Sequence, residues 1–160
     1  MNGWMTTLAV AALVVAVVIK RLYGEPLDAR ELLGPPVVLT GIGAWSVAKE
    51  AGGLTATDIG WLAAGSVLGF ALGALRGRTV RVFERDGVAW QRYTGRTLLV
   101  AVGSFAVMGA FGYLAVKAGM HETARPMTLS IGVSYLGECA AVALRGLSTG
   151  LPFAVQRADR

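Results

Sequence analysis

The chain has 160 residues, of which 54% are hydrophobic and 16% charged, and its formal net charge is +5. An apolar share this high excludes an ordinary soluble domain and predicts an all-α integral membrane protein. With one cysteine and one histidine, the chain cannot build a disulfide framework or the usual zinc and two-histidine haem ligand sets, so no metal site and no cofactor are predicted.

The first predicted membrane span covers about residues 3–19. Trp4 lies at one interface, and Lys20 and Arg21 close the other. A cleaved signal peptide is the alternative interpretation, but signal peptides carry their positive charge before the apolar run, whereas here both charges follow it. The segment is therefore predicted to insert with its amino terminus outward.

Three carboxylates, Glu25, Asp28 and Glu31, follow in a polar segment, each three residues from the next. They would share one face if the segment were helical, and divalent-cation binding or acid–base chemistry could then be imagined there. The favoured interpretation is that they offset the nearby charges of Lys20, Arg21 and Arg30.

The second predicted span covers about residues 32–48. Pro35 and Pro36 are placed in its first helical turn, where their missing N–H groups would lack partners anyway. Lys49 and Glu50 end the apolar part after only about 17 residues, which predicts local thinning of the bilayer or side chains that reach to the interface.

The third predicted span covers about residues 58–75. Thr55 and Asp58 form a variant capping box at its start. Gly65, Gly69 and Gly73 recur every four residues and predict a helix-packing face. Packing within the chain is the favoured interpretation, and a homodimer contact is the alternative.

A β-hairpin is predicted at residues 79–93, because two alternating runs flank an Asp86–Gly87 turn. One face is then cationic and aromatic, and its residues include Arg81, Phe83, Arg85, Trp90 and Arg92. A lone hairpin is marginal in water, so this face is predicted to rest on lipid headgroups. Docking of a cytoplasmic partner is the alternative.

The fourth and fifth predicted spans cover about residues 97–116 and 127–144, and the loop between them holds His121 and Glu122, interpreted as solvated. Glu138 lies near the middle of span five, with no basic residue expected at its depth. It is therefore predicted to be protonated or to accept a hydrogen bond from Ser134, Tyr135 or another helix. A buried packing role is weighed against contact with a proton, ion, lipid or substrate.

The distribution of basic residues among the loops predicts the orientation of the chain in the membrane. Twelve of the fifteen Lys and Arg residues fall in the first loop, the third loop and the carboxyl tail. By the positive-inside rule these parts are cytoplasmic, which predicts five spans with the amino terminus outside and the carboxyl terminus inside. Composition favours a bacterial cytoplasmic (inner) membrane. Anionic lipid headgroups are the predicted partners of the basic loops, and no nucleic-acid partner is predicted.

Two segments carry a family resemblance: KRLYGEPLDARELLGPP at residues 20–36 and LRGRTVRVFERDGVAWQRYTGRTLL at residues 75–99. Together they resemble the CcdC-like small bacterial multi-pass membrane proteins, a family named from genes near those for cytochrome c biogenesis. That resemblance implies a small membrane protein without an established activity, so no site residue carries over.

Ample packing features and no visible nucleophile–base pair, P-loop, nucleotide fingerprint or zinc motif favour a non-enzymatic protein. It is predicted to pack against itself, as a homo-oligomer, or against a larger membrane partner in an accessory or assembly role. Two alternatives remain open. One is a small oligomeric transporter or channel that uses Glu138, and the other is a membrane-embedded enzyme acting on a lipid or prenyl substrate.

Overall fold

The computed structural model describes residues 8, 12, 15–16, 18–124 and 126–154. Its elements in chain order are β1 (Glu25–Pro26), α2 (Ala29–Glu50), the 3₁₀ helix η1 (Ala51–Gly53), α3 (Ala56–Thr79), β2 (Arg81–Arg85), β3 (Val88–Arg92), α4 (Gly95–Lys117), the 3₁₀ helix η2 (Glu122–Ala124) and α5 (Met127–Ser148). Residues 18–23 are helical. Most of the predicted first span at 3–19 lies outside the described residues.

Four helices of the described part are long and apolar enough to cross a membrane: α2 together with η1, α3, α4 and α5. Large apolar side chains cover their outer sides, and Val67 and Leu99 are 71% and 76% exposed. A bilayer accepts such a surface, whereas water would penalise it. The chain therefore has the features of a multi-pass membrane protein.

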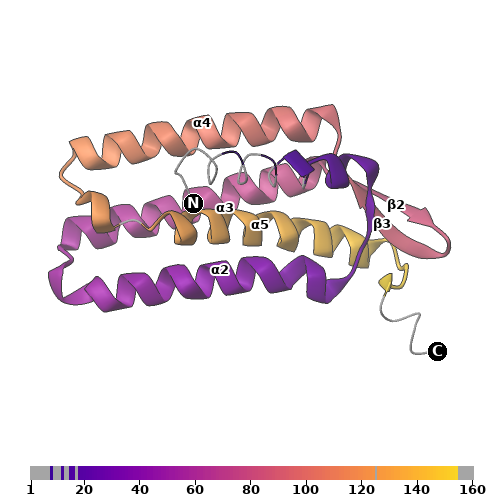
Figure 1. Cartoon of the computed structure of the whole chain (residues 1–160), viewed down its shortest axis with the longest axis horizontal. Coiled ribbons are helices and arrows are strands. Elements are labelled where there is room, and N and C mark those ends of the chain that lie inside the picture. The colour runs from indigo at the N-terminus through magenta and orange to yellow at the C-terminus, as the bar shows by residue number, and fades with distance from the viewer. Residues whose placement is uncertain (1–7, 9–11, 13–14, 17, 125, 155–160) are drawn as a thin grey trace.

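The four long helices lie side by side in the order α4, α3, α5, α2 (Figure 1). Glycines allow these helices to approach closely. A Cβ at Gly43 of α2 would collide with Leu129 of α5, one at Gly132 of α5 would lie 2.6 Å from the backbone nitrogen of Thr40, and one at Gly137 would collide with the Phe70 carbonyl of α3. In lipid, small residues let helix backbones come into van der Waals contact, so α5 packs closely against both α2 and α3.

The predicted hairpin is confirmed, and it gains a third strand. β2 and β3 pair antiparallel with Phe83 opposite Trp90, and the turn residues Asp86 and Gly87 have φ of 56° and 72°. The added strand β1 pairs antiparallel with β3, which gives the order β1-β3-β2. The sequence did not indicate β1, because a two-residue strand carries no alternating pattern.

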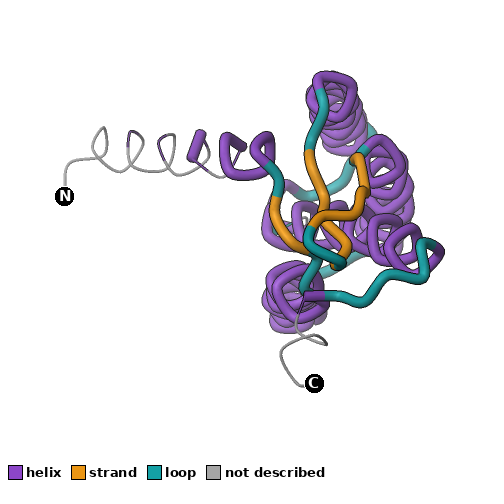
Figure 2. Tube along the Cα trace, turned by 90° about the vertical axis from the view of Figure 1, so that its right-hand side faces the viewer, coloured by secondary structure: helices purple, strands orange, loops and turns teal. Residues whose placement is uncertain are grey.

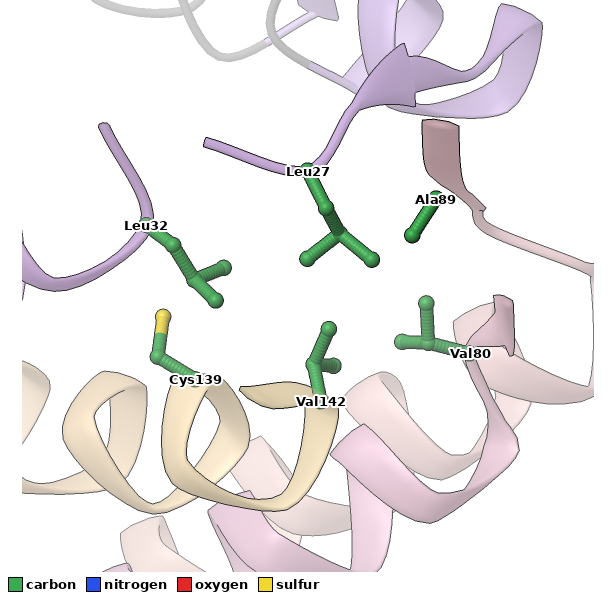
Figure 3. Packing of buried hydrophobic residues seen from close by; sticks show 6 residues of the cluster. All are labelled: Leu27, Leu32, Val80, Ala89, Cys139 and Val142. Carbon is green, nitrogen blue, oxygen red and sulfur yellow. The ribbon is translucent and has the colours of Figure 1, made fainter. Parts of the chain in front are cut away.

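This small sheet lies across one end of the helix bundle (Figure 2). Beneath it, side chains from the sheet, the loops, α2 and α5 form one buried apolar cluster, which consists of Leu27, Leu32, Val80, Ala89, Cys139 and Val142 (Figure 3). The prediction that the hairpin is a lone two-stranded unit is therefore wrong. Its inner face is stabilised by the protein itself, since burial of apolar area supplies the main favourable free energy.

Helix α2 begins earlier than predicted, at Ala29 rather than near residue 32. Asp28 is its N-cap and accepts a hydrogen bond of 2.8 Å from the Arg30 N–H. Pro35 and Pro36 therefore lie inside the helix, and their placement in the first turn was wrong. A good cap upstream outweighed the hydrogen bonds that the two prolines cannot donate.

The capping box at the start of α3 is confirmed. The Thr55 side chain accepts from the Asp58 N–H at 3.2 Å, and the Asp58 carboxylate accepts from the Thr55 N–H at 2.9 Å. A second box, which was not predicted, starts α4 and uses Thr94 and Thr97 in the same reciprocal way. Both boxes satisfy N–H groups that a helix start leaves without partners.

Candidate functional site

Glu138 is buried inside the bundle, with 2% of its side chain exposed, and it has three partners. Arg76 donates from Nε to its Oε2 at 2.6 Å. Its Oε1 accepts from the Tyr93 hydroxyl and lies 3.6 Å from Nη1 of Arg21. A carboxylate removed from water requires such partners, because an unpaired buried charge is very costly. We call these four residues the Glu138 network.

Glycines on α3 bring Arg76 to Glu138. A Cβ at Gly73 would collide with the backbone of Ser134, and a Cβ at Gly77 would collide with the carbonyl of Glu138 itself. Without these side chains, the backbones of α3 and α5 lie close enough for Arg76, in the last turn of α3, to reach the carboxylate.

Arg21 joins the amino-terminal helical segment to the bundle. Its guanidinium carbon lies 5.2 Å from the ring centres of both Tyr93 and Tyr135. It donates to both tyrosine hydroxyls, and its Nε lies 3.7 Å from Glu25 of β1. Cation–π attraction adds to the charge pairing in such an arrangement.

Tyr93 acts as a hydrogen-bond donor in this network. It follows β3, outside the membrane-length helices. Burial, and then the nearby Glu138 carboxylate, raise the pKa of Tyr93 well above its ordinary value. The hydroxyl therefore keeps its proton at neutral pH and continues to donate to Glu138.

A pocket of about 320 Å³ opens beside this network, between α4 and α5. We call it the lateral pocket. Its walls are mainly apolar and include Val18, Leu98 and Ala101. Phe105 and Ile131 line it and are 66% and 46% exposed, so its mouth lies on the side of the bundle, where lipid would be. The volume is within the range of small-molecule sites.

All four residues of the Glu138 network line the lateral pocket, so its lining combines these polar groups with apolar side chains. Both arginines pair with Glu138, and Arg21 is also compensated by Glu25. Among the described residues, Arg76 donates only from Nε to a protein acceptor, so its Nη hydrogens remain for a ligand. A smaller recess of about 70 Å³, whose lining includes Ser104 and Met108, adjoins the lateral pocket.

This arrangement suits an amphiphile with an anionic head. Guanidinium groups donate in a fork that matches carboxylate or phosphate oxygens. The apolar walls suit a hydrocarbon chain.

No family model matches the protein, and neither a curated protein nor a solved structure matches it. The geometry therefore carries the functional argument, and the resemblance to the CcdC-like proteins remains a prediction.

The sequence singled out Glu138 but misjudged its surroundings. The expectation of no basic residue at its depth is wrong, because Arg76 and Arg21 both pair with it. Its hydroxyl donor is Tyr93 from the loop before α4. Tyr135 instead binds Arg21, and Ser134 lines the lateral pocket.

The glycine ladder packs inside the chain. A Cβ at Gly65 would lie 3.0 Å from Phe111 of α4, one at Gly69 would lie 3.5 Å from Met108, and one at Gly73 would meet α5. All three glycines are buried. The packing face is therefore occupied by α4 and α5, which leaves no room there for a second chain.

The predicted cationic and aromatic face of the hairpin lies away from the Glu138 network. Register places Arg81 opposite Arg92, Phe83 opposite Trp90 and Arg85 opposite Val88, as the alternation predicted. The Arg85 guanidinium carbon lies 4.7 Å from the centre of the Trp90 ring. Arg81, Arg85 and Arg92 are exposed. Contact of this face with headgroups or a partner remains a prediction.

The carboxylates of the first loop do not share a helical face. Glu25 lies in β1, Asp28 is the cap of α2, and Glu31 is in the first turn of that helix. Glu25 lies 3.4 Å from Lys20 and 3.7 Å from Arg21, so charge compensation describes it better than cation binding. Among the residues that the structure describes, no group of three or more His, Cys, Asp or Glu is placed to hold a metal.

At the opposite end of the bundle, the structure shows a contact that the sequence did not reveal. Asp58, with 1% of its side chain exposed, accepts from the backbone N–H of His121 at 2.8 Å and lies 3.0 Å from Nδ1 of its ring. His121 had been interpreted as solvated. Its side chain is indeed 63% exposed, but the ring has a buried partner.

Proposed function

We propose that this protein is a multi-pass membrane protein that binds an amphiphile with an anionic head in the lateral pocket. The observation that carries the proposal is an apolar pocket at the side of the bundle whose lining includes buried Arg76, partly buried Arg21 and the Glu138 carboxylate. The head would meet Arg76 and Arg21, and the hydrocarbon part would lie along α4 and α5. Lipids and prenyl-type molecules have this chemistry.

The Glu138 network supports binding more than acid–base chemistry. A carboxylate fixed by two arginines and a tyrosine is an anchor that orients guanidinium groups. Glu138 is therefore proposed to position Arg76 and Arg21 rather than to donate a proton or carry an ion. Preorganised groups bind more tightly because they lose less freedom on binding.

The test fills the lateral pocket without touching the network. Ala101→Trp adds a large side chain to the pocket wall. Val102→Trp is the matched control, because Val102 lies on the same helix, is 68% exposed and does not line the pocket. Each protein is purified in a mild detergent, and the small molecules that remain bound are identified and counted by native mass spectrometry.

We expect wild-type protein and Val102→Trp to retain the same amphiphile and Ala101→Trp to lose it. Apparent melting temperatures verify that both variants fold. Equal retention by the two tryptophan variants would contradict the proposal, as would a folded wild-type protein that retains no amphiphile.

We place the chain in a bacterial cytoplasmic membrane with five spans, the amino terminus outside and the sheet inside. The arrangement of the ends supports this orientation. The sheet, residues 18–23 and the end of α5 lie at one end of the bundle, where Ala154 donates to the Leu27 carbonyl. These are the parts in which the basic residues are concentrated.

Two introduced cysteines test the orientation. Asp86→Cys lies in the hairpin turn and Glu122→Cys in η2 at the other end, and the native Cys139 is buried. A membrane-impermeant thiol reagent added to intact cells should label Glu122→Cys, whereas Asp86→Cys should be labelled only after lysis. The reverse pattern would place the sheet outside.

Packing with a second copy is the second candidate function. Gly34 and Gly41 lie seven residues apart on α2, and a Cβ on either meets nothing within 4 Å, so another helix could approach there. Oxidation in native membranes should convert Gly41→Cys to a disulfide-linked dimer. Gly60→Cys on α3, at another glycine without neighbours, is the matched control, and equal crosslinking of both would indicate random collision.

A further inference from the structure

A second recess, of about 490 Å³, lies at the sheet end of the bundle, and four arginines line it. Each comes from a different element: Arg78 from α3, Arg81 from β2, Arg96 from α4 and Arg145 from α5. We call it the arginine recess. It shares no lining residue with the lateral pocket, so it is a separate site.

Arg145 is held in place by the protein. Its Nη1 donates to the carbonyl of Arg78 at 2.9 Å and to that of Val80, near the carboxyl end of α3. A cation there satisfies carbonyl groups that the helix end leaves without partners. The other nitrogens of its guanidinium have no acceptor among the described residues, and Arg78, Arg81 and Arg96 are exposed around it.

The carbonyl groups at the end of α3 compensate part of the charge of Arg145, but the recess has no carboxylate partner in the described part of the chain. Among the residues that the structure describes, no carboxylate lies within 4.0 Å of these four guanidinium groups, although Arg85 nearby pairs with Asp86. The amino end of α4 adds to the positive electrostatic potential at the recess. Its capping box consists of the neutral residues Thr94 and Thr97, whereas the box of α3 contains the carboxylate of Asp58, which offsets the helix dipole. Like charges gathered in this way repel until an anion binds.

We infer that the arginine recess binds the headgroup of an anionic phospholipid. Phosphate oxygens accept from several guanidinium groups at once, which matches four arginines around one recess. Leu75 favours a lipid over a soluble phosphate. It lines the recess from the membrane-length part of α3 and is 50% exposed, so the acyl chains have an apolar surface below the headgroup.

The test compares two double variants that remove the same charge. Arg81→Gln/Arg96→Gln changes the recess, whereas Arg85→Gln/Arg92→Gln changes the same hairpin outside it. Delipidated full-length protein in a zwitterionic detergent is titrated with phosphatidylglycerol, and bound lipid is counted by native mass spectrometry. Each juxtamembrane arginine contributes about 1 kcal/mol to anionic lipid attraction, so the recess variant should weaken the Kd by at least about tenfold.

The hairpin control should retain affinity close to that of wild type. Both double variants are also compared in an Ala101→Trp background, which blocks the lateral pocket. The recess variant should weaken binding there as well, which separates this inference from the proposed function. Equal loss of affinity in both double variants would overturn it, because general surface charge would then explain the binding. Displacement of the lipid by inorganic phosphate at equal concentration would also overturn it, since the site would then recognise a soluble anion.

Discussion

Two carboxylates are buried at different places in the helix bundle, and they are stabilised in different ways. Asp58 sits in the first turn of α3 and accepts from the backbone N–H groups of Thr55 and His121. Glu138 sits inside α5 and binds the side chains of Arg76, Arg21 and Tyr93. The first relies mainly on backbone donors, and the second relies on side-chain charges.

The difference follows from position along a helix. The first turn has free N–H groups and the positive end of the helix dipole, so a carboxylate there is stabilised without a cation. Inside a helix every N–H is already used, so a buried carboxylate needs side chains from elsewhere in the fold. Glu138 therefore ties distant segments together, whereas Asp58 mainly starts one helix.

The largest expected effect is that of Glu138→Gln. It leaves buried Arg76 without its anion and leaves Arg21 with Glu25 alone, and breaking a buried ion pair costs about 3–5 kcal/mol. The free energy of unfolding in mixed detergent micelles measures this loss. Glu122→Gln, at an exposed position, is the matched control and should leave stability unchanged. Similar stability of the two variants would show that the network is not an anchor.

Next in size is Gly73→Ala, which inserts a methyl group between the backbones of α3 and α5. Overpacking of this kind costs about 1–3 kcal/mol and should also separate Arg76 from Glu138. Gly60→Ala on the same helix meets no neighbour and should be neutral or slightly stabilising, because alanine favours helix. Melting temperatures that fall equally for both would contradict close packing at Gly73.

A smaller effect is expected for Thr55→Ala, which removes the N-cap of α3. Loss of a threonine cap costs about 1 kcal/mol. Thr57→Ala is the control, because Thr57 lies two residues further on, inside the helix and without a capping contact. The same unfolding measurement should show that Thr55→Ala is less stable than Thr57→Ala. The opposite order would show that the Thr55 cap does not stabilise α3.

The smallest effect is expected for His121→Gln. The variant loses the ring contact with Asp58 but retains the backbone N–H that donates to the same carboxylate. Because the ring is largely exposed, water replaces much of its contribution. Stability should fall by less than in Thr55→Ala. A greater fall would mean that the ring, rather than the backbone, holds the outer loop to α3.

The same difference between local and distant partners explains which features the sequence could predict. Local patterns located the capping box at Thr55 and Asp58, the Asp86–Gly87 turn and the glycine ladder, because each depends on residues a few positions apart. The partners of Glu138 lie 45 residues away or further along the chain, and their meeting depends on helix packing that no local pattern encodes.

Sequence reasoning treated Arg21 as a cation that closes the first span, and it counted Arg76 only among the basic residues of the third loop. Their positions at helix ends fitted that view, since snorkelling arginines are common there. The structure instead turns both toward the interior, where Glu138 compensates them. Likewise, β1 depends on a distant partner, Trp90. The early start of α2 is different, because its N-cap Asp28 directly precedes the helix and is a local signal that sequence reasoning missed.

Glu138 is the member of its network that comes last along the chain. Arg21 emerges from the ribosome early and Arg76 midway, but their shared carboxylate arrives with the last helix. Until α5 enters the bilayer, Arg21 has only Glu25 as a counter-ion, and Arg76 lacks the carboxylate with which it pairs. Closure of the network therefore waits for α5, and a chain that stops before residue 138 keeps an unpaired Arg76 at the membrane.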